Sequence, residues 1–424
     1  MLSPIWLAAS VFIVSYAIII SERIHRTVVA LTGALLMILL GVINQEQALE
    51  GVDFNTLGLL IGMMVVVGIA KDSGMFQYLA IWIAKAGRGN PKKIFPFLMI
   101  TVAVLSGVLD NVTTALLMVP VMFVVANNLK INPKPFLIGT ILFANIGGVA
   151  TLIGDPTNIL IGSAADLSFN DFLMNTGPAA IMAALVIGGI LYLKFRHQMV
   201  ATPEAQASIT KFIPREAITN WPLLWKSLSV IALVLVGFIT HNTTHLEGAT
   251  IALGGAALML LLTMRDPEHH LRDVEWTSIF FFVGLFILVV GLEEAGIINY
   301  LAERLIDVTG GKLVATGMII LWGSAIFSAI IDNIPLVATM IPLVQKIGVL
   351  TGADITPFWW ALSLGGNVGG NATLIGASTN VVVSGIAARE GQRITFMEYL
   401  KIAMPITLTV IVVFSAYIYF RYLT

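Results

Sequence analysis

The chain has 424 residues, of which 58% are hydrophobic and only 11% are charged. So few charged side chains cannot cover the surface of a soluble protein of this size, so the composition indicates an integral membrane protein. The formal net charge of −1 gives no reason to expect nucleic acid as a partner, and the absence of cysteine excludes disulfides, thiolate-bound metals and a catalytic thiol.

The first apolar run, residues 4–20, is long enough to cross a hydrocarbon core of ~30 Å. It has no basic region before it, and Arg23 and Arg26 follow it, so we interpret it as a retained span and not as a signal peptide. These bases predict a cytoplasmic first loop, because such loops are rich in Lys and Arg. We therefore predict a multi-pass protein of the plasma (inner) membrane with its N-terminus outside.

Internal repetition is the most informative feature of the sequence. The segment that begins at Val52 reads VDFNTLGLLIGMMVVVGIAKDSGMFQYLA, and the one that begins at Val274, 222 positions later, reads VEWTSIFFFVGLFILVVGLEEAGIINYLA. The same offset relates the motif Asp110-Asn111 to Asp332-Asn333, with no gap over about a hundred residues. We therefore predict a first repeat over residues 1–195, a cytoplasmic linker over 196–222 and a second repeat over 223–424.

Each repeat is expected to contain a re-entrant hairpin and a broken helix. The hairpins are predicted at about 94–126 and 313–350, because apolar arms of ~15 residues with bases at both ends suit a chain that enters and leaves on one side. The broken helices are predicted at about 136–165 and 357–386, where Gly and Pro interrupt apolar stretches. About ten full spans are expected in total, and five of them lie between the start of the third span and the start of its repeat mate. This odd number inverts the second copy, an arrangement typical of secondary transporters.

Polar residues cluster at these interruptions, and an ionisable group at membrane depth costs at least ~2.5 kcal/mol unless it faces a cavity or a partner. The candidate solute-binding residues carry amides and hydroxyls: Asn111, Thr113, Thr114, Asn145, Thr157, Asn158, Asn333, Asn367, Asn371, Ser378, Thr379 and Asn380. Each could also serve helix packing.

Three aspartates are candidates for proton or cation coupling. Asp110 and Asp332 lie at repeat-related positions and would also suit helix N-caps. Asp155 has Ala377 as its repeat mate, and a purely structural requirement should recur in both copies. We therefore predict that Asp155 holds a proton or helps to bind sodium, although it too could cap the helix that restarts at Pro156.

No metal site, cofactor or enzymatic activity is predicted. The histidines of segments 241–245 and 269–270 fall in expected loops beside acids, and we interpret them as solvated. The chain has no Walker A motif, which argues against ATP hydrolysis by this polypeptide.

The polar motifs carry a family resemblance. Asp110-Asn-Val-Thr-Thr-Ala, the run Gly-Gly-Val-Ala-Thr-Leu-Ile-Gly-Asp-Pro-Thr-Asn158, Asp332-Asn-Ile-Pro-Leu and Asn371-Ala-Thr-Leu-Ile-Gly-Ala-Ser-Thr-Asn380 resemble the ArsB/NhaD permeases of the ion transporter superfamily, which include arsenite and antimonite efflux permeases. The resemblance implies a scaffold part and a transport part of hairpins and broken helices, with alternating access. The dicarboxylate carriers of the superfamily have Ser-Asn-Thr at each hairpin tip, which this sequence lacks, so their two-sodium mechanism is not expected.

The leading functional hypothesis is export of arsenite or antimonite in exchange for protons. Arsenous acid is an uncharged trihydroxide, which amides and hydroxyls would suit, and residues 101–162 contain no Arg or Lys apart from the loop bases Lys130 and Lys134. None lies within 356–386 either, which disfavours an anion or dicarboxylate carrier. A sodium/proton antiporter is the main alternative, and a ligand-binding membrane anchor or sensor is the least favoured one. The expected partners are a small inorganic solute, protons or sodium, and the lipid bilayer; a homodimer and a soluble ATPase subunit are left open.

Overall fold

The computed structural model describes residues 4–21 and 23–423, and every regular element within them is a helix. The predicted all-α membrane fold is therefore confirmed. Eight helices are long and apolar enough to cross a bilayer. They are α1 (Pro4–Ser21), α4 (Phe54–Lys71), α7 (Asn111–Leu129), α11 (Gly177–Phe195), α13 (Trp221–Ile239), α17 (Trp276–Glu294), α20 (Asn333–Thr351) and α23 (Phe396–Ile418), the last continued by a π-helical turn to Leu423.

The sequence repeat is also a repeat of helices. The shorter elements of the first copy are α2 (Arg26–Leu39), α3 (Gln45–Glu50), α5 (Met75–Ala86), α6 (Pro91–Ser106), α8 (Lys134–Val149) and α9 (Pro156–Ala165). Their mates are α15 (Gly248–Thr263), α16 (Pro267–Arg272), α18 (Ile297–Thr309), α19 (Leu313–Ser328), α21 (Thr356–Gly369) and α22 (Ser378–Arg389). Each mate begins 222 positions after its partner, so the two copies fold in the same register.

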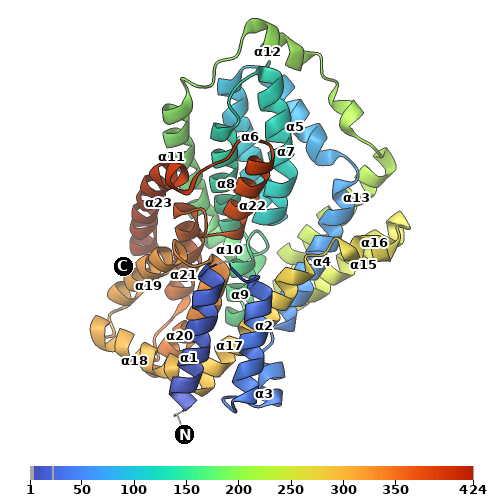
Figure 1. Cartoon of the computed structure of the whole chain (residues 1–424). Helices are drawn as coiled ribbons and strands as arrows, with labels where there is room; N and C mark the ends of the chain where they lie inside the picture. The colour runs from blue at the N-terminus through green and yellow to red at the C-terminus, as the bar shows by residue number, and fades with distance from the viewer. Residues whose placement is uncertain (1–3, 22, 424) are drawn as a thin grey trace.

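The helices α6–α7 and α19–α20 form the two hairpins, which turn at residues 107–110 and 329–332. Figure 1 shows the first hairpin in the upper half of the molecule, whereas α20 of the second hairpin lies in the lower half. The second arms, α7 and α20, have 19 residues each, so they are longer than the ~15 residues expected.

Each broken helix receives the tip of its own hairpin in the same way in both copies. The Ser106 hydroxyl donates to the Ala144 carbonyl at 2.5 Å and the Thr151 hydroxyl to the Gly107 carbonyl at 2.5 Å. In the second copy, Ser328 and Thr373 make the corresponding bonds at 2.5 and 2.7 Å. These side-chain bonds fix each hairpin tip against the break.

The hairpins approach the broken helices closely enough to require glycine. A Cβ added to Gly147 would lie 2.2 Å from the Ala103 carbonyl oxygen, and one added to its mate Gly369 would lie 2.2 Å from the Ala325 oxygen. Both contacts are with backbone, which cannot move aside without displacing a hairpin arm.

We expect Gly369→Ala to lower the free energy of unfolding by at least about 2 kcal/mol, because the added methyl overpacks a helix contact. Gly323→Ala is the matched control, since nothing lies within 4 Å of its added Cβ. It should be neutral, or stabilising by up to ~1 kcal/mol, since alanine favours helix. Thermal unfolding of the two variants in the same detergent measures the difference, and equal midpoints would contradict the close approach.

Helices of the two repeats pack together around this centre, with α4 against α15 and α2 against α17. The linker forms α12 (Pro203–Thr210) and a short 3-10 helix, η1 (Pro214–Ala217), which lie against α7 and α5. It ends where α13 begins, at Trp221. Figure 1 shows α12 at the top of the molecule and the N-terminus at the bottom.

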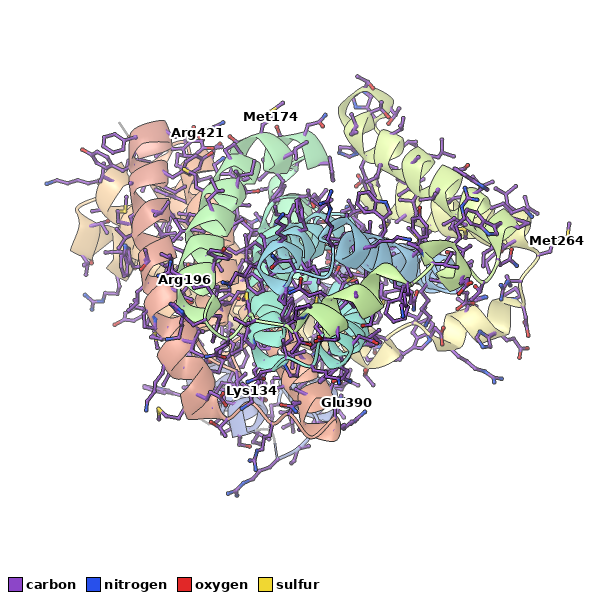
Figure 2. All side chains as sticks on the ribbon, turned by 90° about the horizontal axis from the view of Figure 1, so that it is seen from above. Lys134, Met174, Arg196, Met264, Glu390 and Arg421 are labelled. Carbon is purple, nitrogen blue, oxygen red and sulfur yellow. The ribbon has the colours of Figure 1, made fainter. Side chains whose placement is uncertain are left out.

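The remaining short elements are α10 (Phe169–Asn175), α14 (His241–Thr244) and the 3-10 helix η2 (Gly370–Ala372). Seen from above, Met264 lies at one edge of the molecule, and Arg421 and Met174 lie together toward the other (Figure 2). Arg421 Nη2 donates to the Met174 carbonyl at 2.9 Å, which ties the end of the second repeat to α10 of the first.

Candidate solute site at the junction of the repeats

A network of buried amides joins the two broken helices. Asn145 on α8 donates from Nδ2 to Asn371 Oδ1 at 2.7 Å and to Asn380 Oδ1 at 2.9 Å. Its repeat mate Asn367 on α21 donates to Asn158 Oδ1 at 3.0 Å. These five side chains are at most 2% exposed. Each repeat therefore uses the same asparagine to bind the broken helix of the other.

Asn367 also binds the first hairpin's broken helix and the tip of the second hairpin. Its Oδ1 accepts from Thr157 Oγ1 at 2.8 Å and, at 3.4 Å, from Asn333 Nδ2. Ser363, which the sequence analysis did not select, donates to Asn158 Oδ1 at 2.7 Å.

Asn158 and Asn380 also close the breaks themselves. The Nδ2 of Asn158 donates to the carbonyls of Gly148 at 3.1 Å and Thr151 at 2.9 Å, and that of Asn380 makes the equivalent bonds at 2.8 and 2.7 Å. Because these amides are already used within the protein, a solute could reach them only by displacing the contacts that hold the breaks.

Asp155 lies at the centre of this region with 1% of its surface exposed. Its Oδ1 accepts from the backbone N and the hydroxyl of Thr157 at 2.9 and 2.7 Å, and its Oδ2 accepts from Asn111 Nδ2 at 2.5 Å. Asp155 therefore caps α9, which was one of the two roles expected from the sequence. It also accepts a hydrogen bond from the Asn111 amide at the tip of the first hairpin. No cation contacts it among the described residues.

The second repeat lacks this carboxylate, and the consequence is visible at its threonine. Ala377 replaces Asp155 at the start of α22, and the buried Thr379 hydroxyl, the mate of the one on Thr157, has no hydrogen-bond partner among the described residues. The polar frame is thus duplicated, but the acid is present on one side only.

A cavity of about 110 Å³ lies beside Asp155, between the two hairpin tips, and we call it the central cavity. Its lining comprises Arg26, Leu60, Met64, Asp110, Asn111, Val112, Thr113, Asp155, Pro156, Glu275, Ser278, Phe282, Asn333, Ile334, Ser378 and Val382. Asn111 lines it, and its buried Oδ1 has no hydrogen-bond partner in the described part of the chain. Such unpaired buried oxygens are costly unless a water, ion or solute satisfies them.

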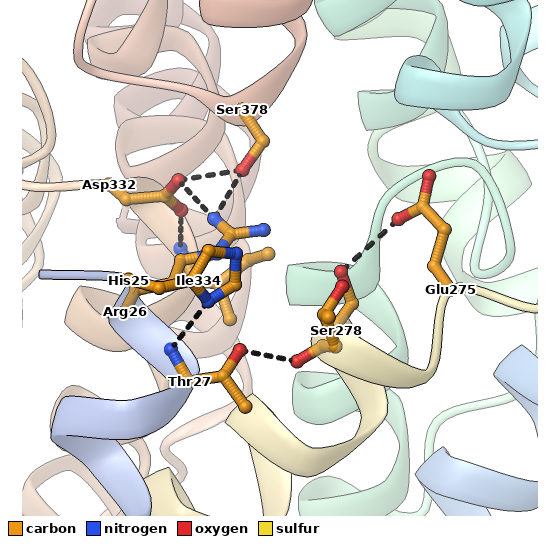
Figure 3. Close-up of polar contacts among 9 residues, drawn as sticks. His25, Arg26, Thr27, Glu275, Ser278, Asp332, Ile334 and Ser378 are labelled. Atoms are coloured by element: carbon orange, nitrogen blue, oxygen red, sulfur yellow. Dashed lines mark hydrogen bonds and ion pairs between the residues drawn. The ribbon is translucent and has the colours of Figure 1, made fainter.

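The other two predicted aspartates cap the hairpin arms. Asp110 accepts from the backbone N of Thr113 at 2.7 Å, and Asp332 from that of Ile334 at 3.1 Å. Only Asp332 also binds a cation: Arg26 Nη1 lies 3.1 Å from its Oδ2 and 2.7 Å from Ser378 Oγ (Figure 3).

Arg26 was missed at the sequence level, where it was interpreted as a loop base. It is the first residue of α2, and its guanidinium stacks over the Phe281 ring at 5.0 Å. The site therefore has a cationic side chain, although residues 356–386 contain no Arg or Lys and residues 101–162 contain only two loop bases. Arg26 reaches the site from a different segment of the chain. Glu275, which accepts from Ser278 at 3.1 Å, was missed for the same reason.

The histidine pair differs from its expected environment. His270 is only 2% exposed, so its interpretation as a solvated residue is wrong, and burial lowers the pKa of its imidazole. Ligand atoms of His269, His270 and Asp273 lie within 4.8 Å of one another, a spacing that could hold a metal ion. Lys71 already donates to Asp273 at 3.0 Å and keeps the pKa of that carboxyl low.

Inverted helical repeats, paired breaks and a cavity with amide, hydroxyl and carboxyl groups where the repeats meet define a membrane transporter of small solutes. The family comparison agrees: residues 16–365 match the citrate transporter model, and the chain belongs to this family, CitMHS. The protein is thus a transporter and not an enzyme.

Relatives and solved structures extend this assignment. The chain is 40% identical over 422 residues to an uncharacterized transporter of Mycobacterium tuberculosis, covering 98% of each. It is 31% identical to the human P protein over 95% of this chain and 58% of that protein. The YdaH transporter of Alcanivorax borkumensis superposes with a TM-score of 0.61 at 14% identity, over 98% of this chain and 97% of YdaH. MtrF of Neisseria gonorrhoeae, described among antimetabolite efflux pumps, superposes with a TM-score of 0.62 at 13% identity, over 99% of this chain and 94% of MtrF. The two structures establish a shared fold.

Proposed function

We propose that this chain exports a small uncharged trihydroxide, arsenite or antimonite, in exchange for protons, by alternating access through the central cavity. The observation that carries the proposal is the lining of that cavity, which combines amides and hydroxyls with the buried Asp155. Neutral donors and acceptors can replace the water around an uncharged solute, and a buried carboxylate is a group that can carry a proton. The resemblance to the arsenite permeases supports the same choice.

The family's description names citrate, and the charges of the cavity argue against a tricarboxylate here. Asp110, Asp155 and Glu275 line it, whereas its one lining cation, Arg26, is held by Asp332. A multivalent anion would meet three carboxylates in a volume of about 110 Å³ without an unpaired cation to balance it.

The test is uptake into inside-out vesicles that contain the protein, under an imposed pH gradient, with arsenite, sodium and citrate supplied separately. Arsenite accumulation that collapses when the gradient is dissipated supports the proposal. Citrate accumulation without arsenite uptake would overturn it. Vesicles that contain the Asp155→Asn variant serve as the control, because they measure the uptake that does not depend on this carboxylate.

A sodium/proton antiporter is the second candidate, and a specific observation favours it. The three carboxylates of the cavity, with Asn111 Oδ1, which has no partner among the described residues, offer the oxygen ligands that a small hard cation prefers. Sodium-dependent dissipation of the pH gradient, with no arsenite uptake, would select this function instead.

A further inference from the structure

A second hollow adjoins the central cavity, and we call it the vestibule. It has a volume of about 270 Å³, and its lining includes the loop between α1 and α2 and the tip of the second hairpin, with Ile24, Ile331 and Asp332. Three residues line both spaces: Arg26, Ser378 and Val382. Their side chains therefore form the wall between the vestibule and the central cavity.

Polar contacts hold this wall closed. Arg26 donates to both Asp332 and Ser378, and the Ser378 hydroxyl donates to the same Asp332 oxygen at 2.7 Å, so the three side chains form a closed triangle (Figure 3). The side chains of Arg26 and Asp332 are 29% and 14% exposed. A partly buried, charge-assisted contact of this kind is stronger than a surface ion pair, yet it can exchange its partners for water.

The triangle joins three separate elements of the fold. Arg26 begins α2, Asp332 caps α20 at the hairpin tip, and Ser378 begins α22 after the break. A shift of the hairpin or the broken helix relative to α2 must therefore break it.

The other repeat cannot build the same closure. The positions that correspond to Arg26, Asp332 and Ser378 are Gly248, Asp110 and Pro156. Gly248 has no side chain and Pro156 has no hydroxyl, so Asp110 lacks both partners. Asp110 nevertheless caps its hairpin arm, so a cap of this kind does not require the triangle. The triangle must therefore have another role.

We propose that Arg26 is the gate residue between the vestibule and the central cavity: its bonds to Asp332 and Ser378 close the passage, and their release opens it. The proposal rests on transport through the repeat junction, but not on which solute is carried.

Cysteine accessibility tests the gate without any solute, because the natural sequence contains no cysteine. Val112→Cys reports on the central cavity and Ile331→Cys on the vestibule, since each lines only one of the two spaces. A membrane-impermeant thiol reagent is applied to each face of the membrane in turn. In the Arg26→Gln and Asp332→Asn backgrounds, labelling of Val112→Cys from the vestibule face should accelerate by about tenfold or more, while that of Ile331→Cys stays unchanged.

Arg23→Gln is the matched control, because Arg23 is an exposed base of the same loop that does not line either space. It should leave both labelling rates unaltered. The exchange Arg26→Asp with Asp332→Arg should restore slow labelling by reversing the ion pair. The gate is refuted if Val112→Cys reacts equally fast in all backgrounds. If the vesicles take up no arsenite but labelling of Val112→Cys still accelerates in the Arg26→Gln and Asp332→Asn backgrounds, only the proposed solute is overturned and the gate stands.

Discussion

Asp155→Asn should abolish proton-coupled transport while the protein still folds. We expect the gradient-driven rate to fall by about two orders of magnitude or more, because asparagine cannot bind and release a proton. Folding should survive, since an asparagine Oδ1 can still accept from Thr157. Asn111 can reverse its amide and present its unpaired Oδ1 to the new donor. Proton flux is measured with a pH-sensitive dye in proteoliposomes, with the solute identified in the vesicle assay.

Asp166→Asn is the control for this experiment. Asp166 is an exposed residue that ends the same helix, α9, in a left-handed conformation that asparagine also adopts readily. Its variant should transport at the normal rate. Unaltered proton-driven transport in Asp155→Asn would remove that carboxylate from coupling and leave it as a helix cap.

Asn367→Ala should destabilise the protein, because this one buried amide binds Asn158, Thr157 and Asn333 where the two repeats meet. It removes the donor to Asn158 and the acceptor of Thr157 and Asn333. Thr157 and Asn158 keep their bonds to Asp155 and from Ser363, whereas the buried Asn333 Nδ2 loses its acceptor among the described residues. Each buried polar group left unpaired costs ~1–3 kcal/mol, so we expect a loss of about 3 kcal/mol in the free energy of unfolding. The midpoint of chemical unfolding in detergent, with its slope, measures the change.

The control for this truncation is Asn127→Ala, at an exposed position near the end of α7. It should change the free energy of unfolding by less than about 0.5 kcal/mol. If Asn367→Ala proved equally mild, the network would be a set of replaceable contacts, and the junction would depend on apolar packing alone.

Duplication and asymmetry serve different purposes in this molecule. The hairpin-to-break contacts of Ser106 and Thr151 recur in Ser328 and Thr373, which is expected of groups that hold the fold. The differences fall at the cavity: the repeat mate of Asp155 is Ala377, and that of Arg26 is Gly248. The groups that the repeats share therefore hold the fold, whereas the groups that differ between them line the cavity.

The sequence alone determined the class of protein, the repeat and the places where helices break. Composition and the lengths of apolar runs identify the solvent as lipid, and a shared offset of 222 fixes the register of both copies because backbone geometry follows local sequence. Glycine and proline mark the breaks for a local reason, since both disturb helical hydrogen bonding wherever the segment lies. Asp155 was identified by the same route, because its repeat mate is alanine.

Only the tertiary structure decided which polar groups meet. The bonds from Asn145 to Asn371 and from Asn367 to Asn158 join residues more than two hundred positions apart. No periodicity within a helix predicts such a pair. Arg26 shows the limit most clearly: a base in a short loop is expected at the membrane surface, yet the way α2 packs brings it to Asp332. The closure of the cavity depends on that packing, which is a property of the whole fold and not of any segment.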